Sequence, residues 1–393
     1  MRIGIMTFWW SNDNYGQLLQ CYALQRYLQD AGHDAYLIRY KNEECSPLWK
    51  KILKAFNPYL LYRHMAYKMK ARRIRSEQLK NSRRFDEFRK TYMVQSEAFY
   101  ASYSQLRESP PQADCYIVGS DQVWNFSFCK KIRRNSDVHA YMLDFGAETT
   151  KRMSYAASWS MDSLSSKLIA EIRPLLQRFS YVSVREEQGL ELCHQCGYGQ
   201  AELVCDPTLL LEAGAYRNLY RSEGVQPQEH KYLLLYMLSN QCDFDIQRVY
   251  DFASERGLEV VYVTGNGVLD KREKRFATIP EWLSLVDNAE YVVTNSFHCC
   301  VFSSLFGTKF GVVRLTGRMA GMNTRLESLF RQLEMEPRWV GDDFAVLDKK
   351  KALIERRLIK AGKEFLDSLN TPPPYHPSPH YITNQPCSST HIS

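Results

Sequence analysis

The sequence predicts an α/β protein built from two domains. Short apolar runs alternate with segments in which apolar residues recur every three or four positions, a pattern typical of strands joined by helices. At 393 residues, the chain exceeds the roughly 250 to 300 residues at which a single core stops growing. A polar stretch over 220–230 separates two alternating regions. We expect an N-terminal α/β domain (1–220), a Rossmann-like C-terminal domain (231–345), a last helix (346–370) and a disordered tail (371–393).

The first domain is predicted to open with a strand, a helix and a second strand. Residues 2–7 are short and apolar, and Gly32 ends a segment of helical periodicity before an extended run over 35–39. A helical, basic insertion over 48–90 follows. Further strands are expected over 115–118, 152–156, 181–184 and 203–205.

The basic insertion carries the charge of the chain. The formal net charge is +7, and residues 63–90 hold eleven Lys/Arg against three Asp/Glu. One interpretation is a solvated helical face. The other is a surface that attracts anionic lipid headgroups or an anionic lipid-linked sugar, with peripheral membrane contact. No nucleic-acid partner is expected, because no recognition motif accompanies the charge.

The cellular compartment is predicted from the absence of a membrane span and of a signal peptide. No stretch approaches the ~20 apolar residues of a membrane span, and the first strand becomes polar too soon for a signal peptide. We expect a cytosolic protein, at the inner face of the membrane if the basic insertion contacts lipid. The eleven cysteines are an odd number scattered through predicted elements, so we expect reduced thiols and no disulfides.

The second domain has the cleaner alternation. Strands are expected over 232–238, 259–264, 290–294 and 309–314, with helices between them. The tail is rich in Pro, Ser, Thr and His, and therefore buries too little apolar surface to offset its ordering entropy.

Ligands of open α/β sheets bind beyond the carboxyl ends of the strands, so the residues that follow predicted strands are candidates for a site. Asn14, Tyr15 and Gly16 follow the first strand and suit a turn that presents N–H groups to an anion. The alternative is an ordinary helix cap. The segment is not a GxGxxG fingerprint, so we infer no dinucleotide cofactor from it.

A second candidate follows the strand that ends at Val118. Ser120, Asp121 and Gln122 are suited to sugar hydroxyls, and Trp124 would offer a stacking surface. A structural turn is the alternative.

Two charged residues follow later strands of the first domain. Arg185 suits a carboxylate or phosphate held bidentately, or a salt bridge to a neighbouring acid. Asp206 precedes Pro207, which prevents the strand from continuing, and is either a catalytic base or a cap.

The most informative segment follows the third strand of the second domain. Asn295, Ser296 and His298 lie where a strand gives way to an apolar helix. A helix N-terminus favours neutral imidazole and attracts a phosphate oxyanion. We therefore expect His298 to be functional.

No metal is expected. Cys193 and Cys196 form a lone CxxC without a second pair, and the adjacent His298, Cys299 and Cys300 point in different directions on a helix.

These segments together resemble the polysaccharide pyruvyl transferase family over about residues 1–340. The order and spacing of the pieces make the match specific. The pieces are Asn14-Tyr15-Gly16, Gln20-Cys21-Tyr22-Ala23-Leu24, Gly119-Ser120-Asp121-Gln122-Val123-Trp124, Ser154-Tyr155-Ala156-Ala157-Ser158, Ser183-Val184-Arg185-Glu186, Asp206-Pro207-Thr208 and Thr294-Asn295-Ser296-Phe297-His298.

The resemblance implies a GT-B-like fold, with two Rossmann-like domains facing a cleft and a last helix that returns to the first domain. It implies an enzyme of cell-envelope polysaccharide or exopolysaccharide biosynthesis. Such an enzyme transfers a pyruvyl group from phosphoenolpyruvate to two hydroxyls of one sugar, forms a cyclic ketal and releases phosphate. The acceptor is a lipid-linked or polymeric glycan.

The resemblance also suggests roles. His298 and Asp206 are the expected catalytic residues; Arg185, Asn295 and Ser296 are expected to bind the donor. Asn14, Tyr15, Gly16, Ser120, Asp121, Gln122 and Trp124 are expected to bind the acceptor. Many relatives have glycine where this chain has Cys299, whose side chain is expected to narrow or reshape the donor site.

Two other functions remain open. A GT-B-like glycosyltransferase that uses a nucleotide sugar has the same architecture, although no clear acidic pair follows a strand to hold a ribose. A non-catalytic glycan-assembly protein would not need His298.

Overall fold

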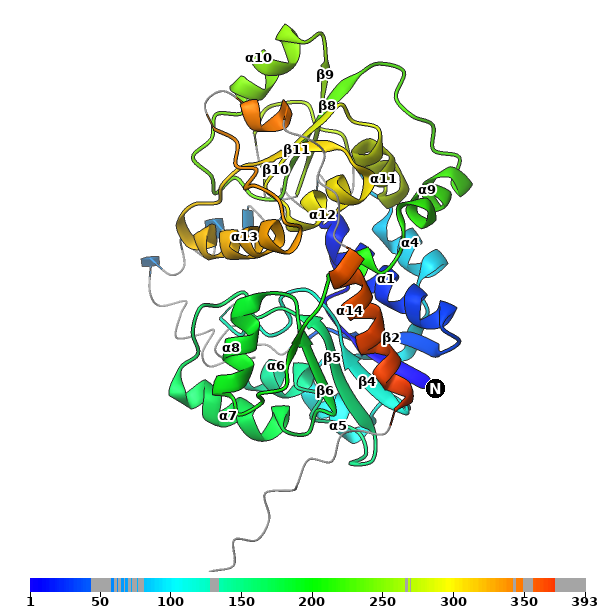
Figure 1. Cartoon of the computed structure of the whole chain (residues 1–393). Coiled ribbons are helices and arrows are strands. Elements are labelled where there is room, and N and C mark those ends of the chain that lie inside the picture. Colours follow the sequence, from blue (N-terminus) through cyan, green and yellow to red (C-terminus); the bar gives the residue numbers. More distant parts are fainter. Residues whose placement is uncertain are drawn as a thin grey trace, which may run out of the picture.

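The computed structural model describes residues 1–43, 81–127, 134–265, 268, 270–341, 344–348 and 356–371, with scattered positions between 58 and 76. The chain forms two parallel β-sheets flanked by helices, one above the other in Figure 1. The predicted α/β class with two sheets is therefore confirmed.

The first sheet has seven parallel strands in the order β3-β2-β1-β4-β5-β6-β7. Its central strands are apolar and buried on both faces, as parallel strands covered by helices must be. The strands are β1 (Arg2–Met6), β2 (Asp34–Tyr40), β3 (Gln95–Tyr100), β4 (Cys115–Val118), β5 (Lys151–Ala157), β6 (Tyr181–Val184) and β7 (Glu202–Leu203).

Helices connect these strands. The first begins where the Asn14 side chain accepts a hydrogen bond from Gln17 N, and the chain leaves it through Gly32, whose φ of 84° favours glycine. The helices are α1 (Tyr15–Asp30), α4 (Phe85–Tyr92), α5 (Tyr103–Glu108), α6 (Arg134–Tyr141), α7 (Ser166–Leu176) and α8 (Glu187–Gln195), followed by the short 3₁₀ helix η1 (Pro207–Leu209).

The second sheet has four parallel strands in the order β11-β10-β8-β9. The strands are β8 (Tyr232–Met237), β9 (Glu259–Thr264), β10 (Tyr291–Thr294) and β11 (Lys309–Val312). The helices are α10 (Gln247–Glu255), α11 (Ile279–Asp287), α12 (Phe297–Phe306) and α13 (Asn323–Gln332), with 3₁₀ turns η2 (Gly317–Met322) and η3 (Ala345–Asp348). A capping box between Thr278 and Glu281 starts α11.

Helix α9 (Ala213–Ser222) lies at the boundary that we expected at residue 220. It packs on α11 and α12. Tyr216 meets Phe302 edge-on at 4.9 Å, and Arg217 pairs with Asp287 at 2.8 Å. Helix α9 is therefore in contact with helices of the second domain, although most of it lies within the range expected for the first.

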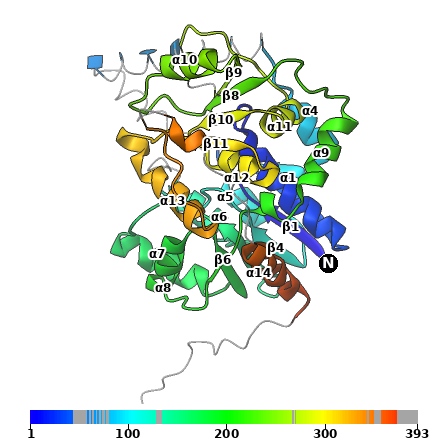
Figure 2. The same ribbon diagram turned by 45° about the horizontal axis from the view of Figure 1, so that its top comes forward.

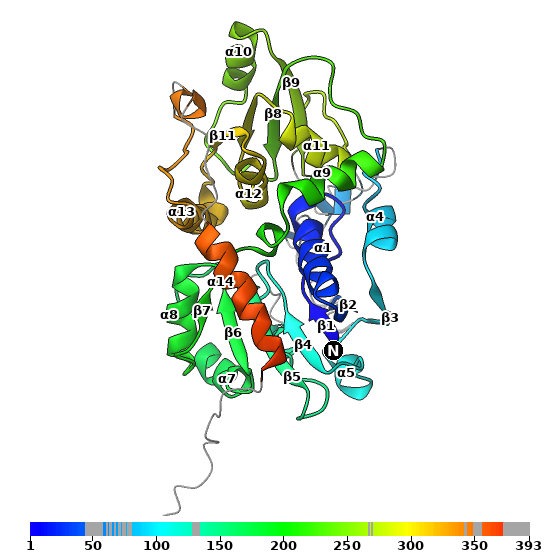
Figure 3. The same ribbon diagram turned by 45° about the vertical axis from the view of Figure 1, so that its right-hand side comes forward.

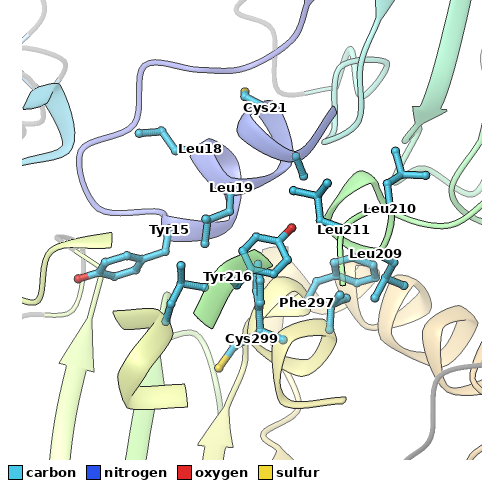
Figure 4. Packing of buried hydrophobic residues seen from close by; sticks show 14 of the residues in the cluster. Tyr15, Leu18, Leu19, Cys21, Leu209, Leu210, Leu211, Tyr216, Phe297 and Cys299 are labelled. Carbon is cyan, nitrogen blue, oxygen red and sulfur yellow. The ribbon is translucent and has the colours of Figure 1, made fainter. Parts of the chain in front are cut away.

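One hydrophobic cluster extends across both sheets, and each sheet also has a cluster of its own. Tyr15, at the start of α1, stacks on Trp282 of α11 at 5.0 Å and donates a hydrogen bond to the carbonyl of Ala277. Helices α1, α9, α11 and α12 gather between the sheets in Figure 2, and Figure 4 shows how α1 and η1 residues interleave with those of α12. The domains are thus packed together rather than joined by a linker alone.

The last helix, α14 (Arg356–Asp367), returns to the first domain, as the resemblance implied. Figure 3 shows it lying across the first sheet. Phe365 contacts Tyr155 and Tyr181, and Lys151 Nζ donates to the carbonyl of Leu369 at 2.9 Å. A Cβ at Gly362 would come within 2.5 Å of the Tyr155 hydroxyl, so glycine permits this close approach.

Most of the basic insertion, and the tail from residue 372, lie outside the described residues. Arg83, at the end of the insertion, is not on a solvated face. It is buried, and its Nη2 donates to the Thr264 carbonyl at 2.8 Å, at the end of β9. None of the described helices combines the length and apolar character needed to cross a bilayer.

Candidate active site

Four polar side chains from the ends of different elements meet between the two sheets. Ser120 follows β4, Arg185 follows β6, Asp206 precedes η1 and His298 is the second residue of α12. All four are buried, with no more than 5% of each residue exposed, so they do not line an open surface. The sequence motifs therefore converge at the carboxyl ends of the strands.

Asp206 is the centre of this cluster. Its Oδ2 accepts hydrogen bonds from Arg185 Nη1 at 2.8 Å and from Ser120 Oγ at 3.2 Å. His298 Nε2 lies 3.5 Å from the same oxygen, which is long for a hydrogen bond. Oδ1 accepts from the Thr208 backbone N–H at 3.0 Å and from its hydroxyl at 2.7 Å. Both carboxylate oxygens are therefore occupied.

Burial alone would raise the pKa of the Asp206 carboxyl. The neighbouring His298, the Arg185 guanidinium and the hydrogen bond from Thr208 outweigh burial and hold that pKa well below its usual range. Asp206 is therefore a fixed anion at neutral pH, better suited to orient its neighbours than to accept a proton.

Helix α1 packs directly against His298. A Cβ on Gly16 would lie 2.2 Å from both Cγ and Nδ1 of the imidazole, so glycine is required for this approach. Gly16, which we expected at the acceptor site, therefore packs against the imidazole ring of His298.

Several nitrogen atoms in the cluster are buried without a hydrogen-bond partner. They are Nε and Nη2 of Arg185 and Nε2 of His298. Buried polar groups are normally paired, because leaving one unpaired costs about 1 to 3 kcal/mol. The Arg185 Nε and Nη2 donors are therefore suited to an anionic ligand, whereas His298 Nε2 faces Asp206 Oδ2 at 3.5 Å.

Asn295 and Ser296 have local partners. Asn295 Oδ1 accepts from Leu238 N at 2.8 Å, its Nδ2 donates to the Ser239 carbonyl at 2.7 Å, and the Ser296 hydroxyl caps α12. Both residues shape the turn that presents His298.

The segment after β4 divides into buried and site-facing parts. Trp124 is fully buried, and its ring lies 4.9 Å from that of Trp159 at an interplanar angle of 53°. Its Nε1 donates to the Tyr141 carbonyl at 3.1 Å, so it offers no face to a sugar, contrary to our expectation. Asp121 has a φ of 77°, a strained conformation for a non-glycine residue that is often found at functional sites.

Tyr15 and Asn14 likewise have structural partners. Tyr15 lies in the core between the sheets, and Asn14 caps α1. Their side chains are not presented to a ligand in this structure.

Sequence reasoning missed two residues beside the cluster. The ring of Phe297 lies 4.4 Å from the Arg185 guanidinium carbon and 5.9 Å from that of Arg325. Arg325 is buried on α13, and with the Gln122 amide oxygen facing it, Oε1 accepts from both Nη atoms at 2.8 and 2.9 Å. Arg325 follows no strand, so the rule that led to the other residues did not find it.

Cys299 does not narrow the site. Its thiol is fully buried in the core between the sheets, where burial raises its pKa to about 12 (Figure 4). Cys193 and Cys196 are also buried thiols with raised pKa values. Within the described part of the chain, no group of three or more His, Cys, Asp or Glu residues could hold a metal ion.

The fold and the buried cluster define an α/β protein of two parallel sheets, with arginine, aspartate and histidine joined where the sheets meet. The family model for polysaccharide pyruvyl transferase matches residues 14–315, most of the chain. The chain therefore belongs to the polysaccharide pyruvyl transferase family.

Other comparisons describe the fold. No curated protein matches the chain in sequence. Among solved structures, it is similar to UDP-GlcNAc 2-epimerase of Methanocaldococcus jannaschii in complex with UDP-GlcNAc and UDP, with 13% identity, 94% of this chain and 99% of that chain covered and a TM-score of 0.48. UDP-N-acetylglucosamine 2-epimerase of Rickettsia bellii has 9% identity, 94% and 96% coverage and a TM-score of 0.48. An alpha-glucosyltransferase in complex with UDP has 10% identity, 93% and 95% coverage and a TM-score of 0.42.

Proposed function

We propose that this chain transfers a pyruvyl group from phosphoenolpyruvate to two hydroxyls of one sugar in a polysaccharide precursor, forming a cyclic ketal. Family membership supports the reaction class. The observation that carries the proposal is the buried cluster of Arg185, Asp206 and His298, in which the unpartnered Nε and Nη2 of Arg185 suit an anionic donor.

In the proposed reaction, the donor gains one proton and loses its phosphate group. A proton is added to C3 of phosphoenolpyruvate, which leaves an oxocarbenium-like centre at C2. One sugar hydroxyl adds to C2, the C2–O bond to phosphate breaks, and the second hydroxyl adds in its place. Of the two hydroxyl protons, one replaces the proton delivered to C3 and the other leaves with phosphate.

In this proposal His298 is the acid that supplies the proton. Asp206 orients His298 and Arg185, because both of its oxygens are occupied and its pKa is low. Arg185 binds a donor anion through Nε and Nη2. Asn295 and Ser296 act on the donor side by fixing the turn before α12.

The acceptor is proposed to be a lipid-linked or polymeric glycan on the first-domain side. Asp121 and Gln122 are the candidates for contact with it, because the strained loop after β4 carries them to the cluster. Ser120 supports Asp206 instead.

The test is phosphate release from phosphoenolpyruvate with a series of lipid-linked sugars, with nucleotide sugars as control donors. His298→Gln should stay folded and lower kcat by about 10² to 10⁴-fold. His194→Gln, an exposed residue on α8, is the matched control and should be unaffected.

Three results would contradict the proposal. Turnover with a nucleotide sugar alone would indicate a glycosyltransferase. Glycan binding without turnover would indicate an assembly protein. A folded His298→Gln variant with normal turnover would remove His298 from the mechanism.

A further inference from the structure

Arg325 is a second buried guanidinium beside the cluster. It lies on α13, beyond the residues 14–315 that the family model matches. Only 6% of the residue is exposed, and its Nε has no hydrogen-bond partner. Its Nη atoms donate to the neutral amide of Gln122. A buried charge with a neutral partner is costly unless a ligand supplies the opposite charge.

Helix α13 holds Arg325 against the first domain. Gln332 Nε2 donates to the backbone carbonyl of Arg185 at 2.8 Å, and Arg331 pairs with Glu187 at 2.8 Å. Figure 1 shows α13 above α8, between the two sheets. Arg325 therefore belongs to a helix that is fixed to the strand end carrying Arg185.

The two guanidinium groups share one aromatic neighbour. The Phe297 ring lies 4.4 Å from the Arg185 guanidinium carbon and 5.9 Å from that of Arg325. Burial and the like charge of Arg185 lower the pKa of Arg325 to about 10. Asp206 neutralises Arg185, but no carboxylate forms an ion pair with Arg325 among the described residues. Asp121, Glu186 and Asp206 act on Arg325 through space, and its guanidinium pairs with none of them, so an anionic ligand could supply a direct counter-ion.

We propose that Arg325 is a second donor-binding residue and that Arg185 and Arg325 together hold the two anionic groups of the donor, a phosphate and a carboxylate. The inference rests on the proposed function. Phosphoenolpyruvate carries both groups on one carbon, so a pair of neighbouring guanidinium groups suits it better than a donor with a single anionic group. The pair would select against free phosphate and against pyruvate.

The test compares donor binding by Arg325→Gln and Arg325→Lys with that of the unchanged full-length protein. The control is Arg314→Gln. Arg314 is a half-exposed arginine before α13 that pairs with Glu327 of α13 at 3.5 Å. Titration calorimetry with phosphoenolpyruvate, inorganic phosphate and pyruvate gives each dissociation constant. Thermal melting without ligand gives the stability of each variant.

Losing a charge-assisted hydrogen bond should weaken phosphoenolpyruvate binding by Arg325→Gln about 10- to 100-fold. The ligand-free melting temperature should fall little or rise, because repulsion from Arg185 is removed. Arg325→Lys should bind phosphoenolpyruvate at least severalfold more weakly, since lysine lacks the planar guanidinium that can donate two parallel hydrogen bonds. The Arg314→Gln control should bind within twofold of the unchanged protein.

A folded Arg325→Gln variant that binds phosphoenolpyruvate within twofold of the unchanged protein would overturn the inference. If that variant does not fold, the same result for Arg325→Lys would overturn it. Failure of the unchanged protein to bind phosphoenolpyruvate would instead count against the proposed function. Weaker binding of phosphate alone, or of pyruvate alone, would support the inference and identify the group that Arg325 holds.

Discussion

Replacing Gly16 with alanine tests whether the first helix positions the imidazole of His298. The new Cβ would lie 2.2 Å from Cγ and Nδ1 of His298. Ordinary contacts between carbon atoms begin at roughly 3.5 Å, so the ring must move by about 1 Å or more. A displacement of that size can lower the rate of a positioned reaction by about 10²-fold. We expect kcat of Gly16→Ala to fall by about that factor.

The stability of this variant combines two opposing effects. Alanine favours a helix over glycine by about 0.5 to 1 kcal/mol, whereas overpacking costs about 1 to 3 kcal/mol. We expect a net loss of roughly 0 to 2.5 kcal/mol in the free energy of unfolding.

Gly214 provides a matched control for Gly16. It is the second residue of α9, as Gly16 is of α1, and a Cβ there would meet nothing within 4 Å. Gly214→Ala should therefore stabilise the protein by about 0.4 to 1 kcal/mol and leave kcat unchanged. Urea unfolding and the phosphate-release assay measure both quantities. If Gly16→Ala turned over at the normal rate, the contact with α1 would not be what positions His298.

Two further predictions concern the ion pair. Arg185→Lys keeps the positive charge but loses the planar guanidinium that can donate two parallel hydrogen bonds. The KM for the donor should therefore rise about tenfold or more in a folded protein. A change in the KM for the acceptor alone would mean that Arg185 does not bind the donor. Asp206→Asn leaves a buried arginine uncompensated and should cost about 3 to 5 kcal/mol at pH 7. Because folding lowers the pKa of Asp206, its stabilisation is complete above the unfolded value of about 3.9 and is lost as the pH falls towards the folded value. The difference in unfolding free energy between the two proteins should therefore shrink below about pH 4, and a pH-independent difference would contradict this assignment.

The positions of the catalytic candidates were predictable from local sequence. Arg185 and His298 follow short apolar strands, Asp206 lies shortly after β7, and parallel strands bring such residues to one edge of their sheet. The strands at 115–118, 181–184 and 259–264 have the predicted bounds, because their apolar runs are bounded by clear breaks.

Features that depend on tertiary packing were not predictable in this way. Strand β3 (Gln95–Tyr100) was missed because it is a mostly exposed edge strand without apolar alternation, and its conformation depends on pairing with β2. Trp124 beside polar residues suggested a sugar platform, but the packing of Trp159 and Tyr141 around it buries the ring. The contact between Gly16 and His298 joins residues 282 positions apart, and no local pattern encodes it.

The return of α14 to the first domain bears on how the chain folds during translation. The first sheet is complete once β7 has left the ribosome, but the helix that packs on Tyr155 and Tyr181 is made roughly 150 residues later. At about 5 to 20 residues per second, this surface stays uncovered for roughly 8 to 30 s. During that interval the nascent chain presents an apolar patch to chaperones and to neighbouring chains. A truncated protein that ends before residue 356 would keep that patch permanently and should aggregate.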